Sequence, residues 1–472
     1  MSAEDAVRAL ARFVARTRFQ DLAPAVVART RWHVLDTLGA ALAGRDAPGV
    51  VEVRGLAQRW RGAAESLVWG TDLRVPAPTA ALVNGTMARA LELDSIHEVG
   101  LLHAAVSAVP AALAAAEARV GVSGREMLVA ALVGSDVICR MGLAPTVGSC
   151  VSGMSFTYQC GTFGAAAAAA RALGLDEDAT VAALGLAYNM ASGNQQPLTE
   201  GSQSVRVQQG VATQMGVMAA EMAAAGLVGP REALEGTFGY FRVYHGGRYD
   251  RQALLKDLGV QFELMNMSFK PWPCCRFIHP AIDAALEILG RRSLAEAEVH
   301  AVEVRVDNLN HYNVVCEPLA EKQVPRTPAE AQFALPFVIA TVLLRGHLTL
   351  ADLTPGALAD PAVRRLARRV TTAIAPEARR GDGRAGYPPG RVEVRLASGE
   401  VLRAEIAVTR GHPDRPLGDA DLTAKFRDCA SAGARPYGRA AQDRIIEAVL
   451  EIERAADVRE ITALLTVPTE EG

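Results

Sequence analysis

The sequence predicts a mainly α-helical fold, with a large all-helical domain and a smaller α/β domain. Half of the 472 residues are hydrophobic, yet only 5% are aromatic, and alanine is the dominant residue. Small side chains suit closely packed helices better than sheets, which favour β-branched and aromatic residues. Apolar and polar residues alternate, as in a half-buried strand, in three short stretches of the second half. A chain of this length can bury a large core and form two domains.

In the first half of the chain, apolar residues recur at helical spacing. They predict two helices within residues 3–45 and further helices from about residue 80 and at about 108–120, 125–142, 164–174 and 211–226. The sequence Ser123-Gly-Arg-Glu126 is a capping-box pattern at the start of the 125–142 helix. The helix at 164–174 is almost pure alanine, so we expect it in the centre of the core. The polar, glycine-punctuated loop at 191–210 lies between core helices and is a candidate pocket wall.

The α/β domain is expected after a shift in composition near residues 262–300. Residues 328–346 read as helix, and the tail from 420 returns to an amphipathic helical pattern. The strand candidates are Val299–Val306, Arg391–Leu396 and Val401–Val408, the last two joined as a hairpin by Ala397-Ser-Gly-Glu400. We therefore predict a helical domain at 1–264, an α/β domain at 265–410 and a C-terminal return to the helical domain at 411–472.

Charge and cysteine content exclude several classes of protein. A net charge of −3 gives no electrostatic reason to expect a nucleic acid or an anionic membrane as partner. The N-terminus is charged from the start and lacks the apolar core of a signal peptide, and no apolar run resembles a membrane span. The seven cysteines are irregularly spaced and show no zinc-binding pattern, which fits a reducing compartment. We therefore expect a cytoplasmic protein.

The stretch from Leu91 to Pro110 carries the first functional hypothesis. It places Asp94, His97, Glu98 and His103 between long apolar runs, and buried ionisable groups are costly unless they are paired or used. On one continuous helix His97 and His103 would diverge by roughly 240°. Gly100 could break that helix and turn both imidazoles toward one cavity. The alternative is an ordinary helix with an exposed His97 and a hydrogen-bonded His103 in the core. The spacing does not favour a metal site, because no His-x3-His pair or third ligand set is present.

Four motifs together resemble the MmgE/PrpD family, over about residues 5–465. They are Leu91-Glu-Leu-Asp-Ser-Ile-His97 with His103, Gly161-Thr-Phe-Gly-Ala-Ala-Ala-Ala, Lys270-Pro-Trp-Pro-Cys-Cys-Arg-Phe-Ile-His-Pro-Ala-Ile-Asp283 and Pro328-Ala-Glu-Ala-Gln-Phe333. The resemblance implies a helical domain with an α/β lid, usually as a homodimer, and an active site between the two domains. It also implies cofactor-independent chemistry on small polycarboxylic acids. By position, Asp94, His97 and His103 match the family's aspartate and two histidines, and Lys270 matches its lid-side lysine.

This chain departs from the family pattern at three positions. The usual Asp-Asp-Thr-His reads Asp94-Ser-Ile-His97, so Ile96 replaces a threonine hydroxyl. Gly153-Met-Ser-Phe-Thr157 has serine where members commonly carry histidine, and Val205-Arg206 replaces a Lys-Arg pair. One imidazole and one ammonium are thus missing from the expected pocket. Fewer cations suggest a substrate with fewer carboxylates, or a different acid in the catalytic cycle.

Lyases and isomerases of this kind move a proton at a carbon next to a carboxylate or carbonyl. That step needs a base whose pKa lies near the working pH, and cations that stabilise the developing enolate-like charge. Our hypothesis makes His103 the acid/base, with Asp94 and His97 orienting it or handling the leaving group. Two cations, Lys270 and Arg206, would hold carboxylate oxygens of the substrate.

The other substrate-binding candidates are Ser155, Thr157 and Tyr312. Each candidate also has a purely structural alternative. Lys270 could be a solvated loop lysine, Arg206 could neutralise a helix end, and Ser155 and Thr157 could cap a helix. The pair Asp136 and Arg140 is more often an internal salt bridge than a site.

Three functions stay open at this point. The first is a cofactor-independent lyase, a dehydratase or decarboxylase of a small carboxylic acid. The second is an isomerase or epimerase of a similar carbon acid, which needs proton transfer but no leaving group. The third is a non-catalytic paralogue that keeps the fold as a binding or scaffold protein.

Overall fold

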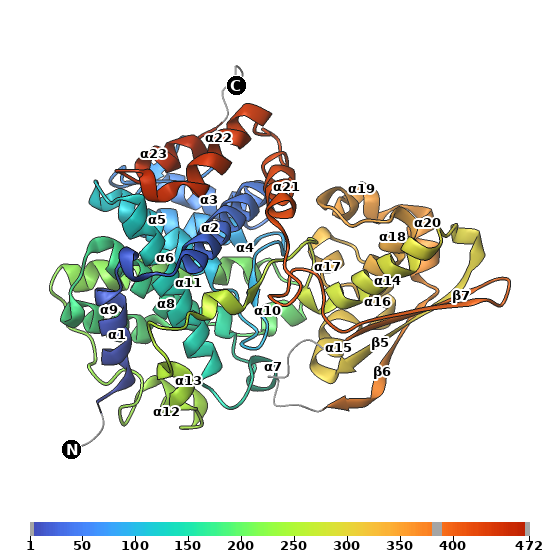
Figure 1. The fold of residues 1–472 in the computed structure, drawn as a ribbon, viewed down its shortest axis with the longest axis horizontal. Coiled ribbons are helices and arrows are strands. Elements are labelled where there is room, and N and C mark those ends of the chain that lie inside the picture. The colour runs from blue at the N-terminus through green and yellow to red at the C-terminus, as the bar shows by residue number, and fades with distance from the viewer. Residues whose placement is uncertain (1–3, 380–388, 468–472) are drawn as a thin grey trace.

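The computed structural model describes residues 4–379 and 389–467 and shows a helical body beside a smaller α/β body (Figure 1). The predicted fold class, mainly α with a small sheet domain, is confirmed. Each body has its own buried apolar core.

The helical body contains most of residues 4–268 and the C-terminal segment. Its strands are the short pairs β1 (Ser66–Leu67) with β2 (Arg74–Val75), and β3 (Ile96–His97) with β4 (Met267–Ser268). Its helices are α1 (Ala6–Arg16), α2 (Pro24–Gly44), α3 (Val50–Trp60), α4 (Ala77–Arg89), α5 (Ala105–Arg119), α6 (Gly124–Leu143), α7 (Ser149–Ser152), α8 (Phe156–Leu173), α9 (Glu177–Met190), α10 (Gln196–Thr199), α11 (Ser204–Ala224), α12 (Tyr240–His245), α13 (Arg251–Leu255), α21 (Asp419–Ala430), α22 (Arg439–Leu450) and α23 (Arg459–Thr462). The C-terminal helices α21 and α22 pack against α2, so the chain ends on the body in which it began.

The α/β body is a four-stranded sheet with helices packed on it. Its strand order is β6-β5-β7-β8, in which β5 and β6 are parallel and the other neighbours antiparallel. The strands are β5 (Val299–Asn308), β6 (Val370–Arg379), β7 (Gly390–Leu396) and β8 (Val401–Ile406). The helices are α14 (His279–Arg291), α15 (Leu309–Val315), α16 (Leu319–Gln323), α17 (Pro328–Ala331), α18 (Leu335–Arg345), α19 (Pro355–Leu358) and α20 (Pro361–Ala367). Buried and exposed residues alternate along β7, as expected for a sheet with one face on a core.

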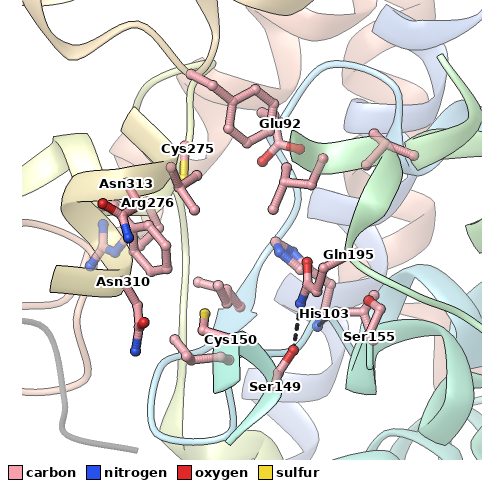
Figure 2. Close-up of a pocket in the computed structure, with 18 of the residues that line it drawn as sticks. Glu92, His103, Ser149, Cys150, Ser155, Gln195, Cys275, Arg276, Asn310 and Asn313 are labelled. Carbon is pink, nitrogen blue, oxygen red and sulfur yellow. Dashed lines mark hydrogen bonds between the residues drawn. The ribbon is translucent and has the colours of Figure 1, made fainter. Parts of the chain in front are cut away.

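The two bodies are joined by buried polar contacts around one acidic side chain. Glu98 accepts hydrogen bonds from Ser268 Oγ at 2.6 Å and from Arg276 Nε at 2.9 Å. Both donors belong to the segment that leads from β4 into the α/β body. Near this junction a cavity of about 510 Å³ lies between the two bodies, with residues from each on its wall (Figure 2).

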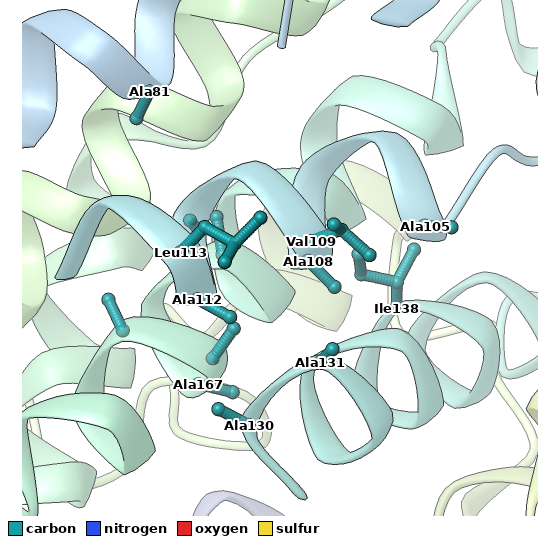
Figure 3. Packing of buried hydrophobic residues seen from close by; sticks show 14 of the residues in the cluster. Ala81, Ala105, Ala108, Val109, Ala112, Leu113, Ala130, Ala131, Ile138 and Ala167 are labelled. Carbon is teal, nitrogen blue, oxygen red and sulfur yellow. The ribbon is translucent and has the colours of Figure 1, made fainter. Parts of the chain in front are cut away.

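Small side chains let the central helices of the body pack closely. The alanine-rich helix α8 contacts α5, α6, α9 and α11, and Figure 3 shows alanine side chains of α5, α6 and α8 gathered between these helices. Where α8 comes closest to α6, the residue on α8 is Gly164, which has no side chain. A Cβ atom added at Gly164 would lie 2.0 Å from Ile138 Cγ1 and 2.5 Å from the Gly134 carbonyl oxygen.

Within the α/β body, two elements differ from the sequence-based expectations. The region expected as one helix at 328–346 is divided into α17 and α18, and Pro336 stands in the first turn of α18, where its missing N–H costs nothing. The strand β6 was not expected, because its sequence does not show the clear alternation seen in β5 and β7. Within the described part of the chain, no helix has the length and apolar character needed to cross a membrane.

The close approach of α8 to α6 makes Gly164 a sensitive position. We expect Gly164→Ala to lower the free energy of unfolding by about 1–3 kcal/mol, because the added methyl group overpacks a rigid contact. The matched control is Gly290→Ala, since an added Cβ there meets nothing within 4 Å. It should leave stability unchanged or raise it by up to about 1 kcal/mol, through helix propensity. Urea unfolding of both variants measures the difference, and equal stability of the two would contradict the packing described above.

Candidate functional site

The loop between α4 and α5 is a tight turn rather than a helix. His97 N–H donates to the Leu102 carbonyl at 2.8 Å, and Leu102 N–H donates back to the His97 carbonyl at 3.3 Å. Residues 98–101 form the turn, in which Leu101 has a positive φ of 49°. The helix is thus broken in the region where Gly100 was expected to break it, but the turn sends His97 and His103 to different surroundings.

A buried cluster of four charged groups stands beside this loop. Lys270 is 0% exposed, and its Nζ donates to Glu92 Oε2 at 2.8 Å and lies 3.9 Å from Asp94 Oδ1. Arg89, the last residue of α4, donates from Nη1 to Glu92 and to Asp94 Oδ1, the latter at 3.3 Å. Two cations therefore face two carboxylates, and the formal charge of the cluster is zero.

The cations of the cluster decide the ionisation of its carboxylates. Burial alone would raise the pKa of Glu92, but Arg89 and Lys270 outweigh it and hold that pKa at about 2. Burial likewise opposes ionisation of Asp94, yet His103, Arg89 and Lys270 hold its pKa well below the usual range. Both carboxylates are therefore ionised at neutral pH.

Asp94 also fixes the orientation of His103. The Nδ1 atom of His103 lies 2.6 Å from Asp94 Oδ2 and 3.2 Å from the Ser95 carbonyl oxygen. Both neighbours are acceptors, so in the neutral ring Nδ1 carries the proton and Nε2 keeps a free lone pair. The backbone N–H of His103 donates to Thr157 Oγ1 at 3.2 Å. His103 lies on the cavity wall, so its basic nitrogen is the one left to face a ligand.

Burial lowers the pKa of His103 below its ordinary value of 6.5. The positive charges of Arg89 and Lys270 lower it further, whereas the negative charge of Asp94 raises it. The imidazole is therefore mostly neutral at pH 7 and able to act as a base.

His97 has a different environment. Its Nδ1 accepts the Gly100 N–H at 3.1 Å, and its Nε2 lies 3.2 Å from Glu263 Oε2. The hydrogen bond from His97 is the main reason that the pKa of Glu263 falls to about 2. His97 is not among the residues that line the cavity. Both of its nitrogens are used to hold the turn against the segment before β4.

Residues from both bodies form the wall of the cavity. Figure 2 shows Asn310, Asn313 and Cys275 from the α/β body on one side. On the other side, from the helical body, lie His103, Ser149, Ser155 and Gln195, with Glu92 near one end. The Gln195 amide donates to Ser149 Oγ at 2.5 Å. The start of α8 also reaches the wall, and a helix N-terminus favours an anion.

The sequence-predicted site residues are only partly brought together. Asp94, His103, Lys270 and Thr157 form one contact group, and Ser155 lies on the same wall and makes no side-chain cap on α8. The buried Lys270 is thus not a solvated lysine.

Two of the predicted substrate-binding residues lie off the cavity wall. Arg206 is buried behind it, and its Nη1 donates to the Pro48 carbonyl at 3.1 Å. Tyr312 directs its hydroxyl to Glu317 Oε1 at 2.9 Å and does not line the cavity. Asp136 and Arg140 form an internal ion pair at 2.6 Å, as the structural alternative predicted.

Sequence reasoning missed Arg89 and Glu92, which complete the charge cluster. Glu92 lies in the stretch from Leu91 to Pro110, where it is a third acidic residue besides Asp94 and Glu98. Its position next to a core helix could have indicated a role in the site. Two cysteines, Cys150 and Cys275, also line the cavity, and burial raises the pKa of their thiols to about 11 and about 12. They are therefore poor nucleophiles. Among residues 4–379 and 389–467, no three or more His, Cys, Asp or Glu side chains are grouped as a metal site.

The arrangement can carry out proton transfer in a partly enclosed site. A neutral imidazole, held by an ionised aspartate, faces a cavity whose wall also presents a guanidinium and an ammonium. A base accepts a proton from carbon most readily where nearby cations stabilise the charge that develops.

Comparison with known proteins gives matches along nearly the whole chain. Residues 8–252 match the MmgE/PrpD N-terminal domain, and residues 272–452 match the MmgE/PrpD C-terminal domain. The chain is 28% identical to the "Cis-aconitate decarboxylase-like protein oryM" of Aspergillus oryzae, covering 97% of this chain and 96% of that one. It is 25% identical to the cis-aconitate decarboxylase of Aspergillus terreus, covering 95% and 93%. It is 26% identical to that of Homo sapiens, covering 94% and 91%.

The environment of His103 predicts its titration. We expect the pKa of His103, followed by NMR of protein labelled in the histidine rings, to lie below 6.5, because burial and two cations disfavour the imidazolium. In Asp94→Asn the favourable charge is lost, so the pKa should fall further. A wild-type pKa at or above 6.5, or a rise in the variant, would contradict this description of the site.

Proposed function

Because the chain belongs to the MmgE/PrpD family, we propose that it is a lyase that decarboxylates or dehydrates a small carboxylic acid. His103 serves as the acid/base at a carbon next to a carboxylate, and the side chains of the cavity supply the chemistry without a cofactor. The relatives that cover nearly all of the chain are named as decarboxylases, which supports a lyase.

One observation carries the proposal: Asp94 holds Nδ1 of His103 at 2.6 Å, on the wall of a cavity between the two bodies. The contact fixes the tautomer in which Nε2 is the free base. The neighbouring cluster of Arg89, Glu92, Asp94 and Lys270 has no net charge, so a proton gained by His103 makes the site positive, and Asp94 at 2.6 Å stabilises that imidazolium. Asp94 is a positioning residue here, because it acts through the imidazole.

In a dehydration, the neutral Nε2 accepts the proton from the carbon next to the carboxylate. The electron pair of that C–H bond forms the new double bond, and the C–O bond at the neighbouring carbon breaks. The departing hydroxide takes the proton back from the imidazolium and leaves as water, so His103 is neutral again. Lys270 and Arg89 stabilise the negative charge that develops on the carboxylate side.

In a decarboxylation, His103 acts as an acid and donates a proton to carbon instead of accepting one. The bond between carbon and the carboxylate breaks, CO2 leaves, and the electron pair stays on the carbon. His103, which has first taken up a proton from solvent, delivers its Nε2 proton to that carbon and becomes neutral again. Asp94 stabilises the imidazolium before the transfer, which is why an ionised carboxylate at Nδ1 helps this reaction as well.

His97 belongs to the proposal as a positioning residue rather than a leaving-group acid. Its hydrogen bonds to Gly100 and Glu263 hold the turn that carries His103. We further propose a homodimer in the cytoplasm, in line with the family resemblance.

The test is proton NMR in D2O on EDTA-treated protein, with acids that carry one to three carboxylates, cis-aconitate included. A decarboxylation should release CO2 and place one deuterium on the carbon that carried it. A dehydration should release water with loss of the C–H signal next to the carboxylate. For a dehydration the rate should hold down to pH 6.5 and fall only below it, because a base with a lowered pKa stays neutral there. For a decarboxylation, which needs the imidazolium, the rate should rise as the pH falls toward the pKa of His103. Asp94→Asn should lower the rate at least about 100-fold.

The matched control for that variant is Asp178→Asn, an exposed carboxylate on α9 far from the cavity, which should keep the wild-type rate. Deuterium exchange without any departing group would instead identify an isomerase or epimerase. Absence of exchange with every acid would favour a non-catalytic protein, and activity that EDTA abolishes would contradict catalysis without a metal.

A further inference from the structure

Most charges on the cavity wall are already compensated by the protein itself. Arg89 and Lys270 are paired with Glu92 and Asp94 within the buried cluster. Arg276 is paired with Glu98, with Nη2 at 2.8 Å from Oε1. These three cations can donate hydrogen bonds to a ligand, but their charges are already balanced.

Among the described residues of the wall, Lys322 on α16 of the α/β body is the cation without an ion-pair partner. Its Nζ donates to the Val314 carbonyl at 2.8 Å and makes no ion pair with a carboxylate of the described chain. The side chain is partly buried, and burial lowers the pKa of its ammonium. Glu321 and Glu330 attract this ammonium from beyond ion-pair distance. A partly desolvated cation with no carboxylate in direct contact is suited to bind one from a ligand.

Apart from Glu317, the rest of the wall is uncharged and combines apolar and neutral polar side chains. The apolar side chains are Ile96, Leu101, Leu198, Val205, Phe277, Val314, Pro318 and Phe333. Between them lie the amides of Asn194, Gln195, Asn310 and Asn313, of which Figure 2 shows the last three around the open space. The remaining wall carboxylate, Glu317, would repel a second anionic group.

From this balance of charge we infer that the substrate is a monocarboxylic acid with a largely apolar remainder, and that Lys322 binds its carboxylate. The inference rests on the proposed function, because it takes this cavity as the substrate site. A di- or tricarboxylate would place its further carboxylates against paired cations, apolar side chains and Glu317. A cavity of about 510 Å³ has room for a small acid of this class.

The experiment measures binding of hexanoate, adipate and propane-1,2,3-tricarboxylate to the full chain by isothermal titration calorimetry at pH 7.5. Hexanoate and adipate have the same chain length and differ in one carboxylate. We expect hexanoate to bind at least tenfold more tightly than either of the other two. Lys322→Met should weaken hexanoate binding at least tenfold, whereas Lys322→Arg should restore most of it.

The matched control is Lys256→Met, which removes an exposed ammonium away from the cavity and should leave hexanoate binding unchanged. Thermal unfolding of each variant confirms that it is folded. Tighter binding of adipate or of the tricarboxylate, no binding of hexanoate, or unchanged hexanoate binding by folded Lys322→Met would each overturn the inference.

The binding experiment can fail or succeed independently of the test of the lyase proposal. Selective hexanoate binding that depends on Lys322, with no proton exchange for any acid, would overturn the lyase proposal but support the inference. Turnover of a tricarboxylate with wild-type rate in Lys322→Met would support the lyase and overturn the inference.

Discussion

Lys270 is fully buried, and a buried ammonium is stable only where carboxylates compensate its charge. Glu92 and Asp94 supply that compensation from the loop after α4, while Lys270 itself comes from the segment that enters the α/β body. The ion pairs therefore join the two bodies at the place where the cavity forms. They also keep Asp94 ionised, and Asp94 in turn sets the tautomer of His103. The position of the base, its protonation and the junction of the bodies thus depend on one cluster.

The helical core contributes to the same site from the other side. Because alanine and glycine allow α8 to pack tightly among α5, α6 and α11, its N-terminal turn is held rigidly at the cavity wall. Thr157 in that turn accepts the backbone N–H of His103. The small residues that make the core dense therefore also fix the backbone that carries the imidazole. Close packing and placement of the base are linked in this fold.

The sequence was most informative where a local pattern decides the structure. Alanine-rich runs and the alternation from Val299 predicted the helices and the sheet, and the polar loop at 191–210 does contribute Asn194 and Gln195 to the cavity wall. Contacts between distant segments could not be predicted in this way. Glu92 and Lys270 are 178 residues apart, and no local pattern shows that they pair.

The sequence also could not distinguish the two histidines. Spacing showed that His97 and His103 diverge on a continuous helix, but the structure replaces that helix with a turn closed by the hydrogen bonds between His97 and Leu102. The direction of the Arg206 side chain could not be predicted from local sequence either. It was expected at the substrate, but in the fold its Nη1 donates to the Pro48 carbonyl. Lys322 drew no attention because only the tertiary fold brings α16 to the cavity.

The central claim is that His103, and not His97, exchanges protons with the substrate. The most direct test compares the turnover of His103→Ala and His97→Gln under identical conditions, with folding of both variants verified. We expect a loss of about 10²–10⁴-fold for His103→Ala and of less than about tenfold for His97→Gln. A larger loss for the His97 variant, or near-normal turnover by folded His103→Ala, would contradict it.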